Sequence, residues 1–126
     1  MEAKTTISSE AMARYRRAAL ARARTRERET EQRREAAWAL ARRAAQLLRD
    51  DFGATRVVAF GSLAHGAWFG PRSDIDLAVE GIPPQAFWRA WCALDRLDPT
   101  VEIDLVATES VPVRLRDEIA AQGVAL

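Results

Sequence analysis

The spacing of apolar and polar positions changes at Gly53, and the change divides the chain into two predicted regions. Residues 1–52 contain neither glycine nor proline and are rich in alanine, arginine and glutamate, which favours one helix from about residue 9 to residue 50. Ser8 or Ser9 suits its N-cap, and Gly53 suits a left-handed C-terminal cap. Four apolar residues recur at helical spacing and are expected to pack on the rest of the chain: Trp38, Ala41, Ala45 and Leu48.

This predicted helix would be about 60 Å long at 1.5 Å per residue, which exceeds what a compact body of this size covers. Apolar residues become scarce between Arg22 and Glu35. We therefore expect the middle of the helix to be solvated, kinked or held by another chain.

After Gly53 the pattern becomes that of short strands and helices. Strands are predicted at residues 56–60, 74–80 and 101–106, the last two with strict alternation. Helices are predicted from the Pro83-Pro84 pair to Asp98-Pro99 and over residues 113–121, followed by a short final strand. This order predicts an α/β fold with a small mixed sheet, helices packed on one face, and a long helix in front of it. We expect two regions, a long basic helix over residues 1–52 and a separate α/β domain over residues 53–126.

Composition is that of a globular chain of one domain, with 126 residues, 48% apolar and 29% charged. No apolar run approaches the roughly 20 residues that a membrane span needs, and residues 1–10 lack the apolar core of a secretory signal. The single cysteine, Cys92, excludes an internal disulfide. We therefore expect a cytoplasmic protein without membrane contact.

Charge is unevenly distributed, with a net charge of +6 over residues 1–50 and −5 over residues 51–126. The basic region has two interpretations. It binds nucleic acid or an acidic partner, or it is a solvated helix whose arginine and glutamate residues pair locally. Interleaved acidic residues from Glu27 to Glu35 support the second interpretation, and they make nucleic-acid binding the less favoured one.

The first candidate for chemistry is the pair Gly61-Ser62, directly after the strand at residues 56–60. A turn into a helix exposes unpaired backbone N–H groups, which bind phosphate well. Gly61 allows a phosphate to approach the backbone, and Ser62 adds a hydroxyl donor. Such a pair alone is a weak signal, because most Gly-Ser pairs are ordinary turns.

The second candidate is a set of carboxylates on neighbouring strands. On a strand, Asp74 and Asp76 point the same way, and aspartate is depleted in strands, so the pair calls for a reason. Asp104 joins them on one surface if its strand lies beside theirs with the apolar faces aligned. Their mutual repulsion is uncompensated without a cation, and hard oxygen ligands suit Mg²⁺. Glu102 shares this face and is the alternative third carboxylate; a solvent-facing acidic strand is the other interpretation of the Asp74–Asp76 pair.

Together these residues resemble a known family. The stretch FGSLAHGAWFGPRSDIDL, residues 60–77, is similar to the signature of the DNA polymerase β-like nucleotidyltransferases, and most of all to the minimal nucleotidyltransferase (MNT) group. That group includes antitoxins that are paired with HEPN-domain toxins. The resemblance covers about residues 53–126 and implies the nucleotidyltransferase fold.

The resemblance also implies roles for the candidate residues. Gly61 and Ser62 would hold the phosphates of ATP, with Ser73 and Arg72 as further candidates for nucleotide contacts. Asp74, Asp76 and Asp104 would be the catalytic residues and the ligands of two Mg²⁺ ions, with Asp104 also acting as the base. Many members have arginine where this chain has His65, which is either a phosphate donor or an inert surface residue.

Three functions follow as hypotheses. We expect no further domain after Leu126 to hold an acceptor, and we therefore expect a partner protein to supply one. The favoured hypothesis is a protein adenylyltransferase that acts as an antitoxin by transferring AMP from ATP to a tyrosine hydroxyl of a HEPN toxin. The N-terminal helix would then dock the toxin or a second copy of the chain. The alternatives are an antitoxin that acts by binding alone, and nucleotidyl transfer to a small molecule or RNA.

Overall fold

A computed structural model describes residues 8–66 and 69–126 of the chain. They divide into two compact units, one ending at Gln32 and the other spanning Arg33–Leu126. Helix α1 (Ser9–Phe52) contributes to both units. No helix of the described residues is long and apolar enough to cross a membrane.

In the first unit, α1 begins at the predicted cap, where the Ser8 hydroxyl accepts a hydrogen bond from the N–H of Ala11. Tyr15 and Leu20 are 65% and 52% exposed, and arginine residues occupy much of the remaining surface. Between residues 8 and 32, this unit therefore has no buried apolar stripe of its own.

The second unit is built on a four-stranded sheet in the order β3-β2-β1-β4. The strands are β1 (Arg56–Phe60), β2 (Ile75–Glu80), β3 (Ile103–Ala107) and the short β4 (Val124–Ala125). β2 runs antiparallel to β1 and parallel to β3, and β4 pairs antiparallel with β1. The helices of this unit, besides the last turns of α1, are α2 (Ser62–His65), α3 (Pro84–Asp95), the 3₁₀ turn η1 (Thr108–Ser110) and α4 (Val113–Gln122).

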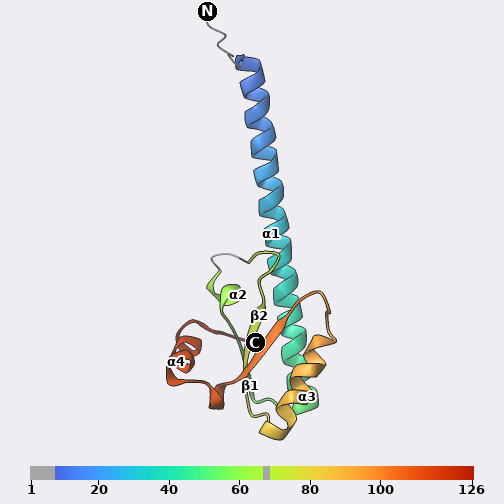
Figure 1. Cartoon of the computed structure of the whole chain (residues 1–126), viewed down its shortest axis with the longest axis vertical. Helices are drawn as coiled ribbons and strands as arrows, with labels where there is room; N and C mark the ends of the chain where they lie inside the picture. Colours follow the sequence, from blue (N-terminus) through green and yellow to red (C-terminus); the bar gives the residue numbers. More distant parts are fainter. Residues whose placement is uncertain (1–7, 67–68) are drawn as a thin grey trace, which may run out of the picture. The chain divides into compact units, whose positions relative to one another are not determined.

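The main core lies between one face of the sheet and the helices α1 and α3 (Figure 1). Alternation along β2 buries Ile75, Leu77 and Val79 on this face. On α1, residues at helical spacing face them, including Ala41, Ala45 and Leu48, which the sequence predicts. The indole N–H of Trp91 on α3 donates to the carbonyl of Ile103, 3.1 Å away, which attaches α3 to the start of β3.

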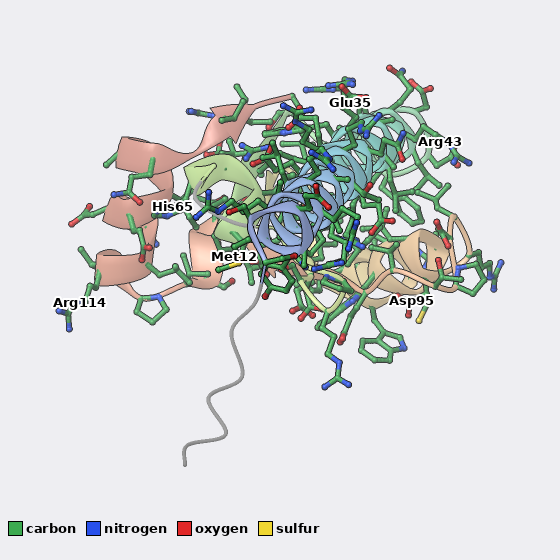
Figure 2. The ribbon with its side chains drawn as sticks, turned by 90° about the horizontal axis from the view of Figure 1, so that it is seen from above. Met12, Glu35, Arg43, His65, Asp95 and Arg114 are labelled. Atoms are coloured by element: carbon green, nitrogen blue, oxygen red, sulfur yellow. The ribbon has the colours of Figure 1, made fainter. Side chains whose placement is uncertain are left out.

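The predicted α/β fold, with its small mixed sheet and long N-terminal helix, is confirmed. One detail differs, because α4 lies on the face opposite to α1 and α3 (Figure 1). The same alternation that fills the main core leaves Val58 and Ala78 on the second face, and Ile119 of α4 packs against them. In the view from above, Arg114 of α4 and Asp95 of α3 point outward on opposite sides of the sheet (Figure 2).

Candidate active site

The candidate site lies on the sheet face that carries α4, at the end of the strands where β1 finishes and where β2 and β3 begin. The strand register places Phe60 beside Asp76, and Asp76 beside Asp104. The alignment proposed from the sequence, with the two acidic strands adjacent and their apolar residues on the same face, is the one that the structure has. All three residues are partly exposed, so this end of the face is open.

Three carboxylates converge at the start of β2 and β3. Oxygen atoms of Asp74, Glu102 and Asp104 all lie within 4.8 Å of one another. The N–H of Ile75 donates to the carbonyl of Glu102 at 3.0 Å, which brings the residues that precede the two strands together. Glu102, the alternative third carboxylate in the sequence, therefore joins Asp104 rather than replacing it.

Asp76 completes the group from the side of β1. A side chain at Gly61 would collide with the carboxylate of Asp76, so the backbone of Gly61 directly abuts this carboxylate. Gly61 has φ +70°, a left-handed conformation that glycine adopts without strain. The predicted phosphate turn and the predicted metal ligands are therefore in contact, with Gly61 as the point where they meet.

The electrostatics of this group are those of unbalanced negative charge. Burial, followed by the charges of Asp104 and Asp74, raises the pKa of Asp76 from an ordinary 3.8 to about 6. Burial and the neighbouring Asp74 and Asp95 also raise the pKa of Asp104. The pKa of Glu102 is raised chiefly by Asp74 and Asp104. Each shift has the sign that burial and neighbouring like charges produce, and a cation bound nearby would oppose it.

These residues fit a divalent cation on chemical grounds. Carboxylate oxygens are hard ligands of the kind that Mg²⁺ takes in sites where it also binds substrate phosphates. Three carboxylates, those of Asp74, Glu102 and Asp104, already lie close together. The charges of two of them, Asp104 and Asp74, also act on the pKa of Asp76. Asp74, Asp76, Glu102 and Asp104 are thus the residues that could hold the metal.

The predicted phosphate turn is the segment from Gly61 through α2. Ser62 is exposed, and the N–H of His65 donates to the carbonyl of Gly61 at 3.0 Å, closing one helical turn. Leu63 is fully buried and anchors the turn in the main core. The side chain of His65, the last residue of α2, is exposed.

A cavity of about 540 Å³ adjoins the carboxylates, and Asp74 and Glu102 form part of its wall. The opposite wall belongs to α1, and Phe69 and Arg72 also face the cavity. Ser73 lines it too, and its hydroxyl oxygen accepts a hydrogen bond from the N–H of Gly70 at 2.9 Å. The volume lies within the range typical of small-molecule sites.

The loop that carries Glu102 is shaped by a side-chain turn. Asp98 accepts hydrogen bonds from the N–H and the hydroxyl of Thr100, at 2.9 and 2.6 Å, and these bonds lower its pKa. The N–H of Val101 bonds to the carbonyl of Asp98 instead of entering the sheet. For this reason β3 begins at Ile103, two residues later than predicted.

Sequence reasoning missed the contribution of α1 to the site. Arg33, Ala36, Ala37 and Leu40 line the cavity, and Arg34 donates to the carbonyl of Gly66. These residues precede the motif by about 30 positions, and no local spacing connects them to it. Only the apolar residues Ala37 and Leu40, which lie four positions before Ala41 and Ala44 respectively, could have indicated that this turn of α1 reaches the sheet.

Comparisons with known proteins agree with this geometry. Residues 41–125 match the model of the nucleotidyltransferase domain. The chain therefore belongs to the nucleotidyltransferase domain family, which supports transferase activity. A search of curated protein sequences finds no significant match.

Three solved structures illustrate the similarity. A candidate minimal nucleotidyltransferase is 31% identical, with 79% of this chain and 94% of that chain covered, at a TM-score of 0.50. A toxin–antitoxin structure with AMP-PNP is 27% identical, with 68% and 70% covered, at a TM-score of 0.57. A complex of tri-AMPylated Shewanella oneidensis HEPN toxin with an MNT antitoxin is 24% identical, with 71% and 70% covered and a TM-score of 0.54, and it supports the fold alone.

Proposed function

We propose that this chain is a Mg²⁺-dependent protein adenylyltransferase that acts as an antitoxin, transferring AMP from ATP to a tyrosine hydroxyl of a HEPN toxin. The observation that carries the proposal is the convergence of Asp74, Glu102 and Asp104 within 4.8 Å, beside an Asp76 that abuts Gly61. The likeness to a toxin–antitoxin structure with AMP-PNP supports the choice of nucleotide and of partner.

In the proposed reaction, the acceptor oxygen forms a bond to the α-phosphorus of ATP, and the bond between that phosphorus and the pyrophosphate oxygen breaks. The backbone of Gly61 and the hydroxyl of Ser62 hold the phosphates. Asp104, which lies in the carboxylate triad, accepts the proton of the acceptor hydroxyl. Mg²⁺ held by Asp74, Asp76 and Asp104, with Glu102 in support, would neutralise charge on the phosphates and lower the pKa of the hydroxyl. Two ions are proposed, since the carboxylates form one close triad and one flanking group.

The remaining part of the nucleotide or of the acceptor has room in the adjoining cavity. Ser73 and Arg72 lie in its wall beside Asp74, where they would contact the substrate. Asp74 and Glu102 belong to both the carboxylate triad and the wall of this cavity, so a substrate in the cavity would lie beside the triad.

The test is an intact-mass measurement of a HEPN partner encoded beside this chain. After incubation with the chain, ATP and Mg²⁺, the partner should gain one or more adenylyl groups on tyrosine, and its toxicity should fall. The Asp74→Asn/Asp76→Asn double variant should leave the partner mass unchanged. An unmodified partner with the wild-type chain contradicts the proposal, and full neutralisation by the double variant assigns the protection to binding alone.

A further inference from the structure

Arg34 of α1 connects that helix to the turn that follows Gly61. Its guanidinium donates to the carbonyl of Gly66 at 2.8 Å and, more weakly, to the carbonyl of Leu63 at 3.5 Å. Arg34 lies outside residues 41–125, which match the family model, so the signature of the family does not include it. The contact spans 32 positions of the sequence within one compact unit.

The turn needs such an anchor because α2 is too short to be stable alone. A single helical turn of four residues leaves its last carbonyl groups without partners inside the helix. The planar fork of an arginine can bond two carbonyl groups at once in a fixed geometry, whereas the donors of a lysine lie on a single flexible ammonium group. Leu63 fixes the turn from the core side, and Arg34 fixes it from the outer side.

The fit between Arg34 and the turn is close. Gly66 has φ +74°, and a side chain added there would come within 2.9 Å of the Arg34 guanidinium. The turn is also connected rigidly to the site, since the N–H of His65 bonds to the carbonyl of Gly61, whose backbone abuts Asp76. A shift of the Gly66 end of the turn would therefore move Gly61 against the carboxylates.

We propose that Arg34 is a positioning residue of the nucleotide site: by holding the carbonyls of Leu63 and Gly66, it sets the distance between the phosphate turn and the carboxylate cluster. That the turn binds the phosphates of a nucleotide rests on the proposed function. The contact itself and its effect on the turn do not.

The first measurement tests the contact without any activity. Hydrogen–deuterium exchange of residues 62–66 is compared in the full-length wild type, Arg34→Ala, and Arg42→Ala, an exposed arginine on the same helix. We expect the His65 amide to exchange about tenfold faster in Arg34→Ala, the order expected for the loss of a charge-assisted hydrogen bond, and not to change in Arg42→Ala. Equal exchange in all three proteins overturns the proposal.

The second measurement tests the effect on the site through the affinity for AMP-PNP with Mg²⁺ and through the KM and kcat for ATP. Arg34→Ala should raise the dissociation constant and KM about tenfold, with a smaller change in kcat and with Arg42→Ala at the wild-type values. Arg34→Lys should restore part of the loss. Complete restoration by lysine would show that charge alone is sufficient, and it would overturn the positioning role.

The outcomes separate the two proposals. A wild type that neither binds AMP-PNP nor transfers a nucleotide defeats the proposed function, and the positioning role with it. An active wild type with unchanged KM in Arg34→Ala defeats the positioning role alone, even if the melting temperature falls. Gly66→Ala provides a second variant, because it displaces the guanidinium without removing it and should raise KM in the same direction.

Discussion

Two neighbouring rows of residues on the same face of the sheet have opposite roles. One row joins Val58, Ala78 and Val106 across β1, β2 and β3, and the next row joins Phe60, Asp76 and Asp104. The first row is covered by Ile119 of α4 and is almost fully buried at Val58 and Ala78. The second row is partly exposed and acidic. A distance of two residues along each strand thus separates a packed surface from a candidate active site.

The difference shows how a small sheet supports both stability and chemistry. The covered row stabilises the fold because it removes apolar surface from water, at about 25 cal/mol per Å². The acidic row opposes stability, because burial and then the neighbouring like charges disfavour the charged carboxylates and raise the pKa of Asp76 and Asp104. We therefore expect changes in the two rows to separate stability from activity.

The largest expected effect is the loss of transfer on changing Asp74 to asparagine. Asp74 belongs to both the carboxylate triad and the cavity wall, so its loss removes a metal ligand next to the substrate. We expect kcat/KM to fall by about 10³-fold or more, the order seen when one electrostatic contact in a transition state is removed. The matched control, Asp95→Asn on α3, removes one negative charge outside the triad and should retain activity within a few-fold. Comparable losses in both variants would contradict a specific role for Asp74.

The second effect falls on the covered row. Ile119→Ala removes the side chain that packs against Val58 and Ala78, and it should lower the free energy of unfolding by about 2–3 kcal/mol. Urea denaturation measures this loss, and the kcat of the folded protein should stay near the wild-type value. Val113→Ala, at an exposed position of the same helix, should change stability by less than about 0.5 kcal/mol. A strong loss of kcat in Ile119→Ala would show that the two rows are not separable.

Much of this comparison could be predicted from the sequence. Alternation with a period of two placed Ile75, Leu77 and Val79 on one face of the sheet and the carboxylate of Asp76 on the other. This follows because successive side chains of a strand point to opposite faces. The alternation also indicated that Asp76 and Asp104 would meet if their strands were neighbours. The long helix followed from the absence of glycine and proline before Gly53.

The rest depended on tertiary contacts that no local pattern encodes. Pro112 before it and Gly123 after it predict the helix over residues 113–121, but they do not say which side of the sheet this helix covers. The cavity wall and Arg34 come from a turn of α1 that is distant in sequence from the motif. The start of β3 was displaced by the Asp98–Thr100 turn, whose side-chain hydrogen bonds compete with the sheet.

The third prediction concerns the border of the acidic row. Gly61→Ala forces a side chain into the carboxylate of Asp76 at a left-handed position, whereas Gly53→Ala has the same left-handed strain at φ +74° and open space around it. We expect a loss of about 1–2 kcal/mol for Gly53→Ala from strain alone, and a larger loss of about 3 kcal/mol for Gly61→Ala from strain and overlap. Only Gly61→Ala should abolish AMP-PNP binding, as measured by calorimetry. Equal effects on binding would mean that the contact between Gly61 and Asp76 is not part of the site.

The smallest effect is a gain of stability, and it tests whether the acidic row is built for a cation. The pKa of Asp76 is raised to about 6 in the folded chain, so the folded state binds more protons than the unfolded state between about pH 4 and pH 6. Its charge therefore lowers the free energy of unfolding progressively as the pH rises through that window, and an asparagine at this position does not.

In EDTA at pH 7, Asp76→Asn should consequently be more stable than the wild type, by about 1 kcal/mol once solvent screening of this half-exposed group is allowed for. The difference should shrink as the pH falls to about 4 and disappear below that pH, once the aspartate is protonated in the unfolded state as well. Added Mg²⁺ should raise the melting temperature of the wild type more than that of the variant, which keeps the triad but lacks one flanking carboxylate, because a ligand that binds the folded state stabilises it. A variant that is less stable than the wild type in EDTA would mean that Asp76 contributes to the fold rather than to a cation site.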